Sequence, residues 1–236
     1  MQGIYETFRS FSGVYALLPE HQKRLERSCG ALGVEVPKLR DLLLKQFQPD
    51  LRVRVDVEAS GEVKLKMEQI SAWDGSFLWH EKWKLKPVHL VRKEPEFKST
   101  DIAAQQEARA EAAKEGFQEV LLVNEKGEVM EGGISNVFLE SNGGVITPGE
   151  GVLPGIGREL ILKAAEELGV KVEFRPLLVS ELQGLNESLP LFLSNSIRGM
   201  VATGPVTPLM REISDWCSSF LQKRIDAERG EVRGDS

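Results

Sequence analysis

The stretch VMEGGISNVFLES, residues 129–141, places the carboxylate of Glu131 between apolar strand residues and a pair of glycines. Residues 119–130, EVLLVNEKGEVM, have the pattern of two short strands joined by a turn at Gly127. Residues 135–139 alternate like a half-buried strand. The carboxylate is explained either by a simple turn or by a positively charged group lying over that turn. The second explanation requires partners elsewhere in the chain.

Composition limits the class of protein. The chain has 236 residues, 41% of them apolar and 28% charged, which is enough for one large or two small globular domains. The net charge is −6 and no basic stripe carries interleaved aromatic residues, so no nucleic-acid partner is expected. The histidines are scattered and the two cysteines form no metal or disulfide pattern, which favours a cytoplasmic protein without a bound metal. No run approaches ~18 apolar residues and no signal peptide is recognisable, so no membrane span is expected.

The first part of the chain predicts helices and a hairpin. A helix is expected over residues 20–32, with Gly33 at its end, and a short helix over 37–44. Residues 51–70 alternate strictly on both sides of Gly61, which is a strong hairpin signal. Further strands are expected over 11–18, as a pair, and over 88–92. The tryptophans between them, Trp73, Trp79 and Trp83, are assigned to the core rather than to a pocket.

Pro95 breaks the pattern, and helices and short strands alternate after it. We expect helices over residues 101–115 and 210–225, and a further helix that opens from the glycine-rich loop 151–159 and runs through 168. Strands are expected over 119–123, 128–130, 135–140, 144–148, 170–177 and 189–196, and a second loop over 201–209. The predicted fold is therefore α+β, with mixed sheets in two lobes, a small lobe over 1–95 and a larger one over 96–225. Residues 226–236 are expected to form a frayed polar tail.

Two segments of the larger lobe could hold an anion. Gly155 and Gly157 flank the start of a helix, where free backbone N–H groups and the positive end of the helix dipole favour negative charge. The run SNSIRG, residues 194–199, places hydroxyl and amide donors at the end of a strand. Taken alone, the first is equally well explained as a loop and the second as a turn.

Together these segments resemble a known family. Five motifs occur in the order found in the class IV aminotransferases, the fold-type IV pyridoxal-phosphate enzymes, and the resemblance runs from Ile4 to about Pro205. The family includes branched-chain aminotransferases, D-amino acid aminotransferases and aminodeoxychorismate lyases. The motifs are HQKRLERS (21–28), the lysine of EFKSTD (96–101), VMEGGISNVF (129–138), LPGIGRE (153–159) and LFLSNSIRG (191–199). The resemblance implies the family's two-lobed fold and pyridoxal 5'-phosphate as cofactor.

The resemblance assigns Lys98 as the catalytic lysine that holds the cofactor as a Schiff base. Lys98 precedes a predicted helix and lies 33 residues before Glu131, at the family's spacing. Lys93 is the nearest rival, but it stands before Pro95 and outside the motif. Glu131 is then the carboxylate that pairs with the pyridinium nitrogen, and the glycines after it are expected to let the backbone pass close to the ring.

The same resemblance assigns the phosphate group to Arg24, to the backbone N–H groups of Ile156 and Gly157, and to the hydroxyl of Ser196. Arg24 alone would be an ordinary solvated helix residue. Many relatives carry threonine or serine where this chain has Gly157, so one hydroxyl contact is missing here. Arg158 is expected to play a structural part.

Substrate contacts are assigned to four residues, Tyr5, Arg9, Asn195 and Ile197. The residues near the N-terminus are equally well explained as ordinary strand residues. Relatives carry a further strand before the segment resembling residues 4–11, and the interval from Arg24 to Lys98 is short for the family, so we expect a trimmed small lobe.

The resemblance implies a lyase or an aminotransferase acting on a small molecule with an amino group, in a homodimer. The segments KSTD and NSIRG look closer to aminodeoxychorismate lyase-like proteins, which form 4-aminobenzoate and pyruvate in folate biosynthesis. The alternatives are a branched-chain or D-amino acid aminotransferase, and a protein that binds the cofactor or a partner without catalysis.

Overall fold

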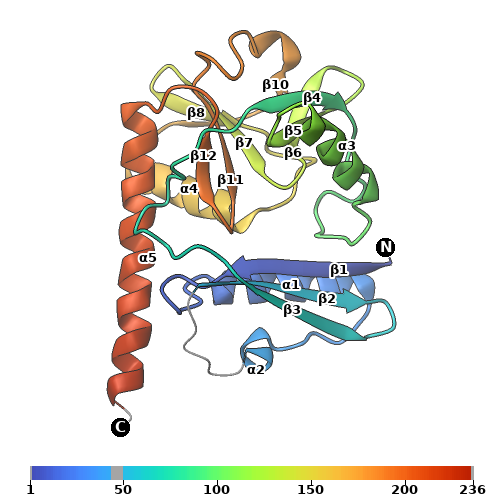
Figure 1. Ribbon diagram of the computed structural model, residues 1–236, viewed down its shortest axis with the longest axis vertical. Helices are drawn as coiled ribbons and strands as arrows, with labels where there is room; N and C mark the ends of the chain where they lie inside the picture. Colours follow the sequence, from blue (N-terminus) through green and yellow to red (C-terminus); the bar gives the residue numbers. More distant parts are fainter. Residues whose placement is uncertain (1, 44–49, 235–236) are drawn as a thin grey trace. The chain divides into compact units, whose positions relative to one another are not determined.

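The computed structural model describes residues 2–43 and 50–234, and it groups the chain into two compact units (Figure 1). Unit 1 comprises Met1–Ser76, Phe97–Asp101 and Ser218–Ser236, and unit 2 comprises Phe77–Glu96 and Ile102–Cys217. The sequence predicted one boundary after residue 95. The grouping in the structure is discontinuous instead, because the segment before residue 96 adds a strand to unit 2 and the segment after it pairs with a strand of unit 1.

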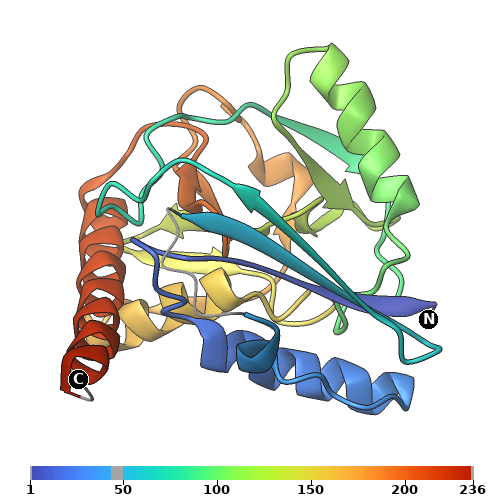
Figure 2. The ribbon, with the colours of Figure 1, turned by 60° about the horizontal axis from the view of Figure 1, so that its bottom comes forward.

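Unit 1 is a three-stranded antiparallel sheet covered on one face by a helix. The sheet has the order β1-β2-β3 and consists of β1 (Gly3–Arg9), β2 (Leu51–Glu58) and β3 (Val63–Gln69). The hairpin predicted around Gly61 is confirmed. Helix α1 (Leu18–Leu32) runs along one face of this sheet (Figure 2). The core between them is apolar and includes Ile4, Phe8, Leu25, Cys29, Val53, Val55 and Val57.

Capping explains the limits of α1. Pro19 stands in its first turn, where the missing N–H has no intrahelical partner to lose. The helix ends at Gly33, whose φ of 74° lies in the left-handed region, as predicted. A short helix α2 (Leu39–Leu42) follows, and its predicted end at Leu44 lies outside the described residues. The expected strand pair over residues 11–18 is reduced to one bridge between Phe11 and Val14.

The last helix, α5 (Pro208–Gly234), is longer than the predicted 210–225 and takes up most of the segment expected to be a frayed tail. The division between the units falls inside it, after Cys217. Its second half belongs to unit 1, where the Arg224 guanidinium donates to the Ala16 carbonyl at 2.9 Å and pairs with Glu20 at 2.7 Å.

Unit 2 contains two mixed sheets. The four-stranded sheet has the order β10-β6-β5-β4, with β4 (Leu85–His89), β5 (Glu119–Val123), β6 (Glu128–Gly132) and β10 (Leu177–Leu178). The five-stranded sheet has the order β12-β11-β7-β8-β9, with β7 (Asn136–Ser141), β8 (Gly144–Thr147), β9 (Val172–Phe174), β11 (Leu191–Asn195) and β12 (Gly199–Ala202). The pairs β4–β5 and β8–β9 are parallel and the others antiparallel, which confirms the mixed sheets. A 3-10 turn (Val179–Glu181) follows β10.

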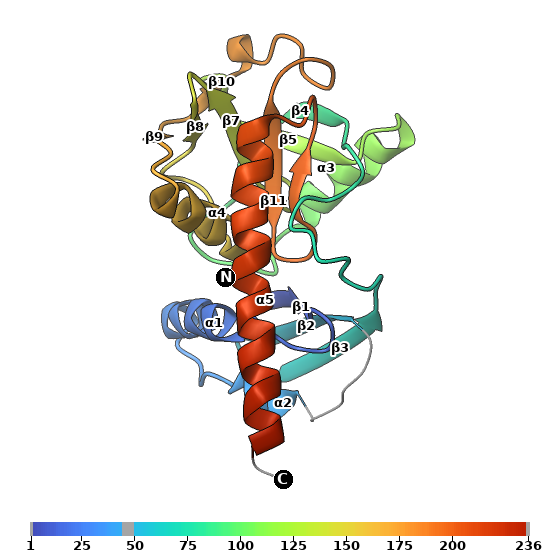
Figure 3. The ribbon, with the colours of Figure 1, turned by 90° about the vertical axis from the view of Figure 1, so that its left-hand side faces the viewer.

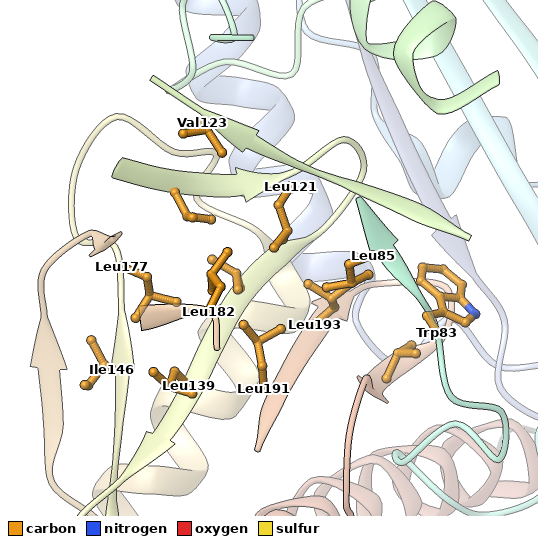
Figure 4. Packing of buried hydrophobic residues seen from close by; sticks show 13 residues of the cluster. Trp83, Leu85, Leu121, Val123, Leu139, Ile146, Leu177, Leu182, Leu191 and Leu193 are labelled. Atoms are coloured by element: carbon orange, nitrogen blue, oxygen red, sulfur yellow. The ribbon is translucent and has the colours of Figure 1, made fainter. Parts of the chain in front are cut away.

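The main core of unit 2 lies between these two sheets (Figure 4). It contains Trp83 at 5% exposure, and Trp79 packs against it. Strand β5 is buried on both faces: Leu121 and Val123 enter this core, while Val120 and Leu122 pack under helix α3 (Ala103–Lys114). Figure 3 shows α3 beside β4 and β5. Burial on two faces explains why the run EVLLV is apolar without alternation.

A shift in register between β5 and β6 sets the direction of Glu131. Leu122 pairs with Glu131 and Val123 pairs with Val129, so Met130 is an extra residue on β6. Leu122 and Val123 are successive strand residues and face opposite sides of the sheet. Glu131 therefore points to the side of the sheet opposite the core in which Val129 lies. An extra residue in a strand, here Met130, commonly redirects a neighbouring side chain in this way.

Within the described residues, no helix is long and apolar enough to cross a membrane, and no group of three or more His, Cys, Asp or Glu side chains could hold a metal ion.

Candidate active site

The residues assigned from the sequence divide between the two units. Tyr5, Arg9, Arg24 and Lys98 belong to unit 1. Glu131, Ile156, Gly157, Asn195, Ser196 and Ile197 belong to unit 2. Each unit brings its own set into a defined arrangement.

Lys98 lies beside the start of β1. Its carbonyl accepts the N–H of Tyr5 at 2.8 Å, and the following Ser99 forms an antiparallel bridge with Ile4. The Lys98 Nζ lies 4.6 Å from the centre of the Tyr5 ring, and the guanidinium carbon of Arg54 lies 4.0 Å from the centre of the same ring. A half-buried amine and a guanidinium therefore share one aromatic ring.

Arg54 is oriented by its neighbour on β2. Its Nε donates to Asp56 at 2.9 and 3.0 Å, and its Nη2 donates to the same carboxylate at 2.6 Å. This bidentate pairing fixes the plane of the guanidinium over Tyr5. Arg9 differs, because it is 6% exposed and pairs with the buried Asp50 at 3.0 Å. The Arg9 side chain thus has a structural partner within unit 1.

Arg24 is held by a carboxylate on the sheet. Its Nε and Nη2 each donate to Glu6 at 2.7 Å, and His21 Nδ1 lies 2.8 Å from Glu6 Oε2. All three side chains are at most 3% exposed. Burial alone would raise the pKa of Glu6, but the Arg24 charge, hydrogen bonds from Arg24 and the nearby His21 outweigh burial and lower it to about 2. An ionised carboxylate only accepts, so His21 donates from Nδ1.

The charge of this cluster extends to the lysine. Burial lowers the pKa of His21, its bond to Glu6 opposes that effect, and the positive charges of Arg24 and Lys98 lower it further. The positive charge of the Lys98 amine therefore acts on His21, which lies in the cluster around Arg24 and Glu6.

Glu131 is buried, at 2% exposure, and is not an exposed turn residue. Its Oε1 accepts the Nε of Arg92 at 2.6 Å, and its Oε2 accepts the backbone N–H of Leu153 at 3.1 Å. A positively charged group of the protein, Arg92, therefore lies against Glu131, and the pairing of Glu131 with a pyridinium nitrogen stays a prediction.

The glycines after Glu131 make room for side chains of unit 2. A Cβ on Gly132 would lie 2.2 Å from the Ser135 hydroxyl, and one on Gly133 would lie 2.7 Å from Arg109 Cδ. The adjacent turn is held by Glu119, which accepts from the backbone N–H of Ile134 at 3.1 Å and from Arg109 at 3.0 Å. These contacts are a reason for the two glycines within unit 2, and the close approach of the backbone to a ring stays a prediction.

The two phosphate candidates of unit 2 lie against each other. Helix α4 (Ile156–Glu167) begins after Gly155, and the N–H groups of its first turn have no acceptor within the helix. A Cβ on Gly157 would lie 2.5 Å from Ser194 Oγ and 3.0 Å from the carbonyl carbon of Asn195. The departure from serine or threonine at position 157 thus has a packing reason.

The turn after β11 is organised by Asn195, whose side-chain oxygen accepts the N–H groups of Ile197 at 3.0 Å and Arg198 at 2.9 Å. Ser194 Oγ and Asn195 Nδ2 are buried without a hydrogen-bond partner among the described residues. Buried donors without partners are costly, and an anion held at this helix start would offer acceptors. The residues present therefore fit a phosphate-bearing cofactor.

Other predicted residues have structural partners. Arg158 donates to the Pro148 carbonyl at 2.9 Å, in keeping with its expected structural part. Three residues of the arrangement were not assigned from the sequence, namely Arg92, Arg54 and His21. Only His21 carried a local signal, because it stands three residues before Arg24 on one face of α1.

The fold is that of a class of pyridoxal-phosphate enzymes. The family model for "Amino-transferase class IV" matches residues 3–203. The chain belongs to this family, and it is accordingly a pyridoxal-phosphate-dependent enzyme of the lyase or aminotransferase type.

Individual relatives carry two different activities in their names. A "Probable branched-chain-amino-acid aminotransferase" of Thermotoga maritima is 30% identical, over 90% of this chain and 85% of that protein. An "Aminodeoxychorismate lyase" of Bacillus subtilis is 28% identical, over 83% of this chain and 74% of that protein. A crystal structure described as "Putative 4-amino-4-deoxychorismate lyase" is 27% identical, covers 90% of each chain and superposes with a TM-score of 0.74.

Proposed function

We propose that the chain is a 4-amino-4-deoxychorismate lyase, which releases pyruvate and leaves 4-aminobenzoate for folate biosynthesis. One observation carries the proposal: the Lys98 amine and the Arg54 guanidinium lie on the same Tyr5 ring, 4.6 and 4.0 Å from its centre. An amine suited to a Schiff base thus stands beside a fixed cation suited to a substrate carboxylate.

The charge of the sheet face around Tyr5 supports an anionic substrate. Residues paired across β1 and β2 share a face, and Arg54 and Arg52 lie on the Tyr5 face. Arg52 is 41% exposed, whereas Arg54 is 26% exposed. Each arginine pairs with a carboxylate on the same face, Arg54 with Asp56 and Arg52 with Glu68. The substrate of the lyase carries two carboxylates, which would take the place of these partners.

When bound, pyridoxal phosphate supplies an electron sink for the bond-breaking step. The residues of this chain then have separate tasks. Lys98 holds the cofactor and afterwards moves a proton at the reacting carbon. Glu131 accepts a hydrogen bond from the protonated ring nitrogen. The N–H groups of Ile156 and Gly157, with the Ser196 hydroxyl, hold the phosphate.

Arg24 completes the phosphate set in this proposal. Arg24 donates to Glu6 through Nε and Nη2, and a guanidinium suits the oxygens of a phosphate as well as those of a carboxylate. Glu6 then orients Arg24 for the anion. Tyr5, Asn195 and Ile197 are proposed to contact substrate, and Arg9 to support the strand that carries Tyr5.

A second candidate is a branched-chain or D-amino acid aminotransferase. The identity of 30% with the Thermotoga maritima protein, over 90% of this chain, favours it. Lys98 and Glu131 serve both reactions, so the two candidates differ in the substrate accepted and not in the cofactor.

The deciding experiment is the visible spectrum of the purified protein with pyridoxal phosphate, followed during addition of aminodeoxychorismate or of single L- and D-amino acids. The lyase keeps its Schiff-base absorbance during turnover and forms pyruvate, which a coupled lactate dehydrogenase assay measures. Loss of that absorbance with an amino acid, and formation of a keto acid, would identify an aminotransferase. If the protein never develops the Schiff-base absorbance, both candidates are contradicted. The remaining alternative is then a protein that binds a partner without catalysis.

Two further expectations remain proposals, namely a homodimer and a cytoplasmic location. Light scattering coupled to size-exclusion chromatography tests the first, and cell fractionation tests the second.

A further inference from the structure

Arg92 fixes the carboxylate of Glu131 from a segment that no motif singled out. It lies after β4, and its Nε donates to Glu131 Oε1 at 2.6 Å, with side-chain exposures of 5% and 2%. The N–H of Leu153, from the loop before α4, holds the other oxygen at 3.1 Å. Both oxygens of Glu131 are thus held by separate segments of unit 2, so the orientation of the carboxylate is set.

Stability alone is a weak explanation for this arginine. Arg92 is 7% exposed, and its Nη1 has no hydrogen-bond partner among the described residues. Removing a guanidinium from water is costly, and a buried ion pair often contributes little net stability. The cost is larger when one donor stays unsatisfied. These facts favour a role for Arg92 in the charge of Glu131.

Burial favours the neutral form of a carboxyl group. Glu119, another buried carboxylate of unit 2, shows the effect: burial raises its pKa although Arg109 lies 3.0 Å away. Glu131 is as deeply buried as Glu119, and its partner Arg92 lies nearer and is more deeply buried than Arg109. An adjacent positive charge favours the ionised form of a carboxyl group. When a carboxyl group and a ring nitrogen share one proton, a positive charge beside the carboxyl group moves that proton toward the nitrogen.

We propose that Arg92 is a positioning residue that keeps the proton shared by Glu131 and the cofactor ring on the ring nitrogen. Arg92 acts through Glu131 and touches neither cofactor nor substrate. The inference rests on the proposed function, because it requires Glu131 to meet the ring nitrogen. The change is the location of one proton: with Arg92 present Glu131 is ionised and the nitrogen protonated, and without it the proton lies on Glu131.

Three variants separate charge from hydrogen bonding. Arg92→Lys keeps the charge, Arg92→Gln keeps a neutral donor, and Arg92→Met removes both. Arg175→Met is the control, because it removes an arginine that pairs with Glu173 and Glu181 in the same unit. Each protein is loaded with pyridoxal phosphate labelled with ¹⁵N in the ring, and the ¹⁵N resonance reports whether that nitrogen carries a proton. Thermal unfolding without cofactor reports folding separately.

We expect the protonated resonance in the wild type, in Arg92→Lys and in Arg175→Met. Arg92→Met and Arg92→Gln should move it toward the unprotonated position and raise the dissociation constant of the cofactor about tenfold, a loss within the range of one charge-assisted hydrogen bond. If Arg92→Met does not fold, the similarly sized Arg92→Gln gives the same answer.

The possible failures are distinguishable. A wild type that binds no pyridoxal phosphate contradicts the proposed function and this inference together. A wild type that binds it through Lys98, with the same protonated resonance in Arg92→Gln and Arg92→Met, overturns the role of Arg92 alone. An unprotonated ring nitrogen in Arg92→Lys as well would show that the planar guanidinium of arginine is needed and that a positive charge is not sufficient. This result would also contradict the proposal.

Discussion

Two hydrogen bonds of 2.7 Å join the guanidinium of Arg24 to the carboxylate of Glu6, and both side chains are almost fully buried. The pair joins α1 to β1 within unit 1. It also sets the direction of an arginine that the family resemblance assigns to phosphate binding. Breaking the Arg24–Glu6 pair should therefore lower both the stability of the protein and its affinity for the cofactor.

Acid should weaken the fold through Glu6. The pKa of Glu6 falls from 4.5 to about 2 on folding, so the native state binds this proton less readily than the unfolded chain does. The contribution of Glu6 to the free energy of unfolding is present above pH 4.5 and is lost as the pH falls toward about 2. Denaturant unfolding between these values measures it. Glu6→Gln should be less stable by about 3 kcal/mol at neutral pH, the cost of breaking a buried ion pair, and less sensitive to acid in this range.

The control is Glu68→Gln, because Glu68 pairs with Arg52 in the same unit but both side chains are 41% exposed. An exposed ion pair contributes little to stability, so this variant should unfold like the wild type. Equal losses in the two variants would contradict a special role for Glu6.

Replacement of Lys98 by alanine should abolish the Schiff base and lower turnover by about three orders of magnitude or more, since the same amine carries the proton transfer. Reduction with borohydride followed by peptide mass analysis locates the modified lysine. Lys93→Ala is the matched control and should keep both the label and the activity. A label found at Lys93 would reassign the catalytic lysine.

Replacement of Glu131 by glutamine keeps the shape of the side chain but removes its charge. We expect the cofactor still to bind and turnover to fall about tenfold to a hundredfold, the usual range for losing a hydrogen bond to a charged group. Steady-state kinetics and cofactor titration measure the two effects separately. Unchanged turnover would return Glu131 to a structural role.

Threonine at position 157 would restore the hydroxyl found in many relatives, but here it should be harmful. The added Cβ would meet Ser194 Oγ at 2.5 Å, and Asn195 backbone lies just behind. Overpacking of this kind costs roughly 1–3 kcal/mol, so Gly157→Thr should melt at a lower temperature and bind pyridoxal phosphate more weakly. Gly30→Ala is the control, since a Cβ added at this position of α1 would meet nothing within 4 Å. It should be neutral or slightly stabilising. Tighter cofactor binding in Gly157→Thr would contradict the packing explanation.

Local patterns predicted most of the elements because their causes are local. The alternation on both sides of Gly61 and the left-handed cap at Gly33 depend on neighbouring residues alone. Residues 201 and 202 were expected at the start of a loop, yet they belong to β12, because their strand character comes from pairing with β11. The extra residue at Met130 was equally invisible, since a register shift is a property of two strands.

The same reasoning applies to the candidate site. Lys98 and Glu131 were found through motifs at a known spacing. The partner of Glu131 was not, because Arg92 lies 39 residues away and only the fold brings the two together. Likewise the roles of the two glycines after Glu131 depend on Ser135 and Arg109, and the sequence does not show how close these side chains lie.

The discontinuous grouping of the chain has a consequence for its synthesis. The last segment of unit 2, which ends at Cys217, is made before Ser218 and the helical residues that follow it, although the sheet of unit 1 is made first of all. Unit 1 is therefore completed last, when Arg224 reaches Ala16 and Glu20. A protein shortened before residue 218 would keep every segment of unit 2 but would leave unit 1 without its closing piece, and expression of nested C-terminal truncations would reveal this as loss of soluble product.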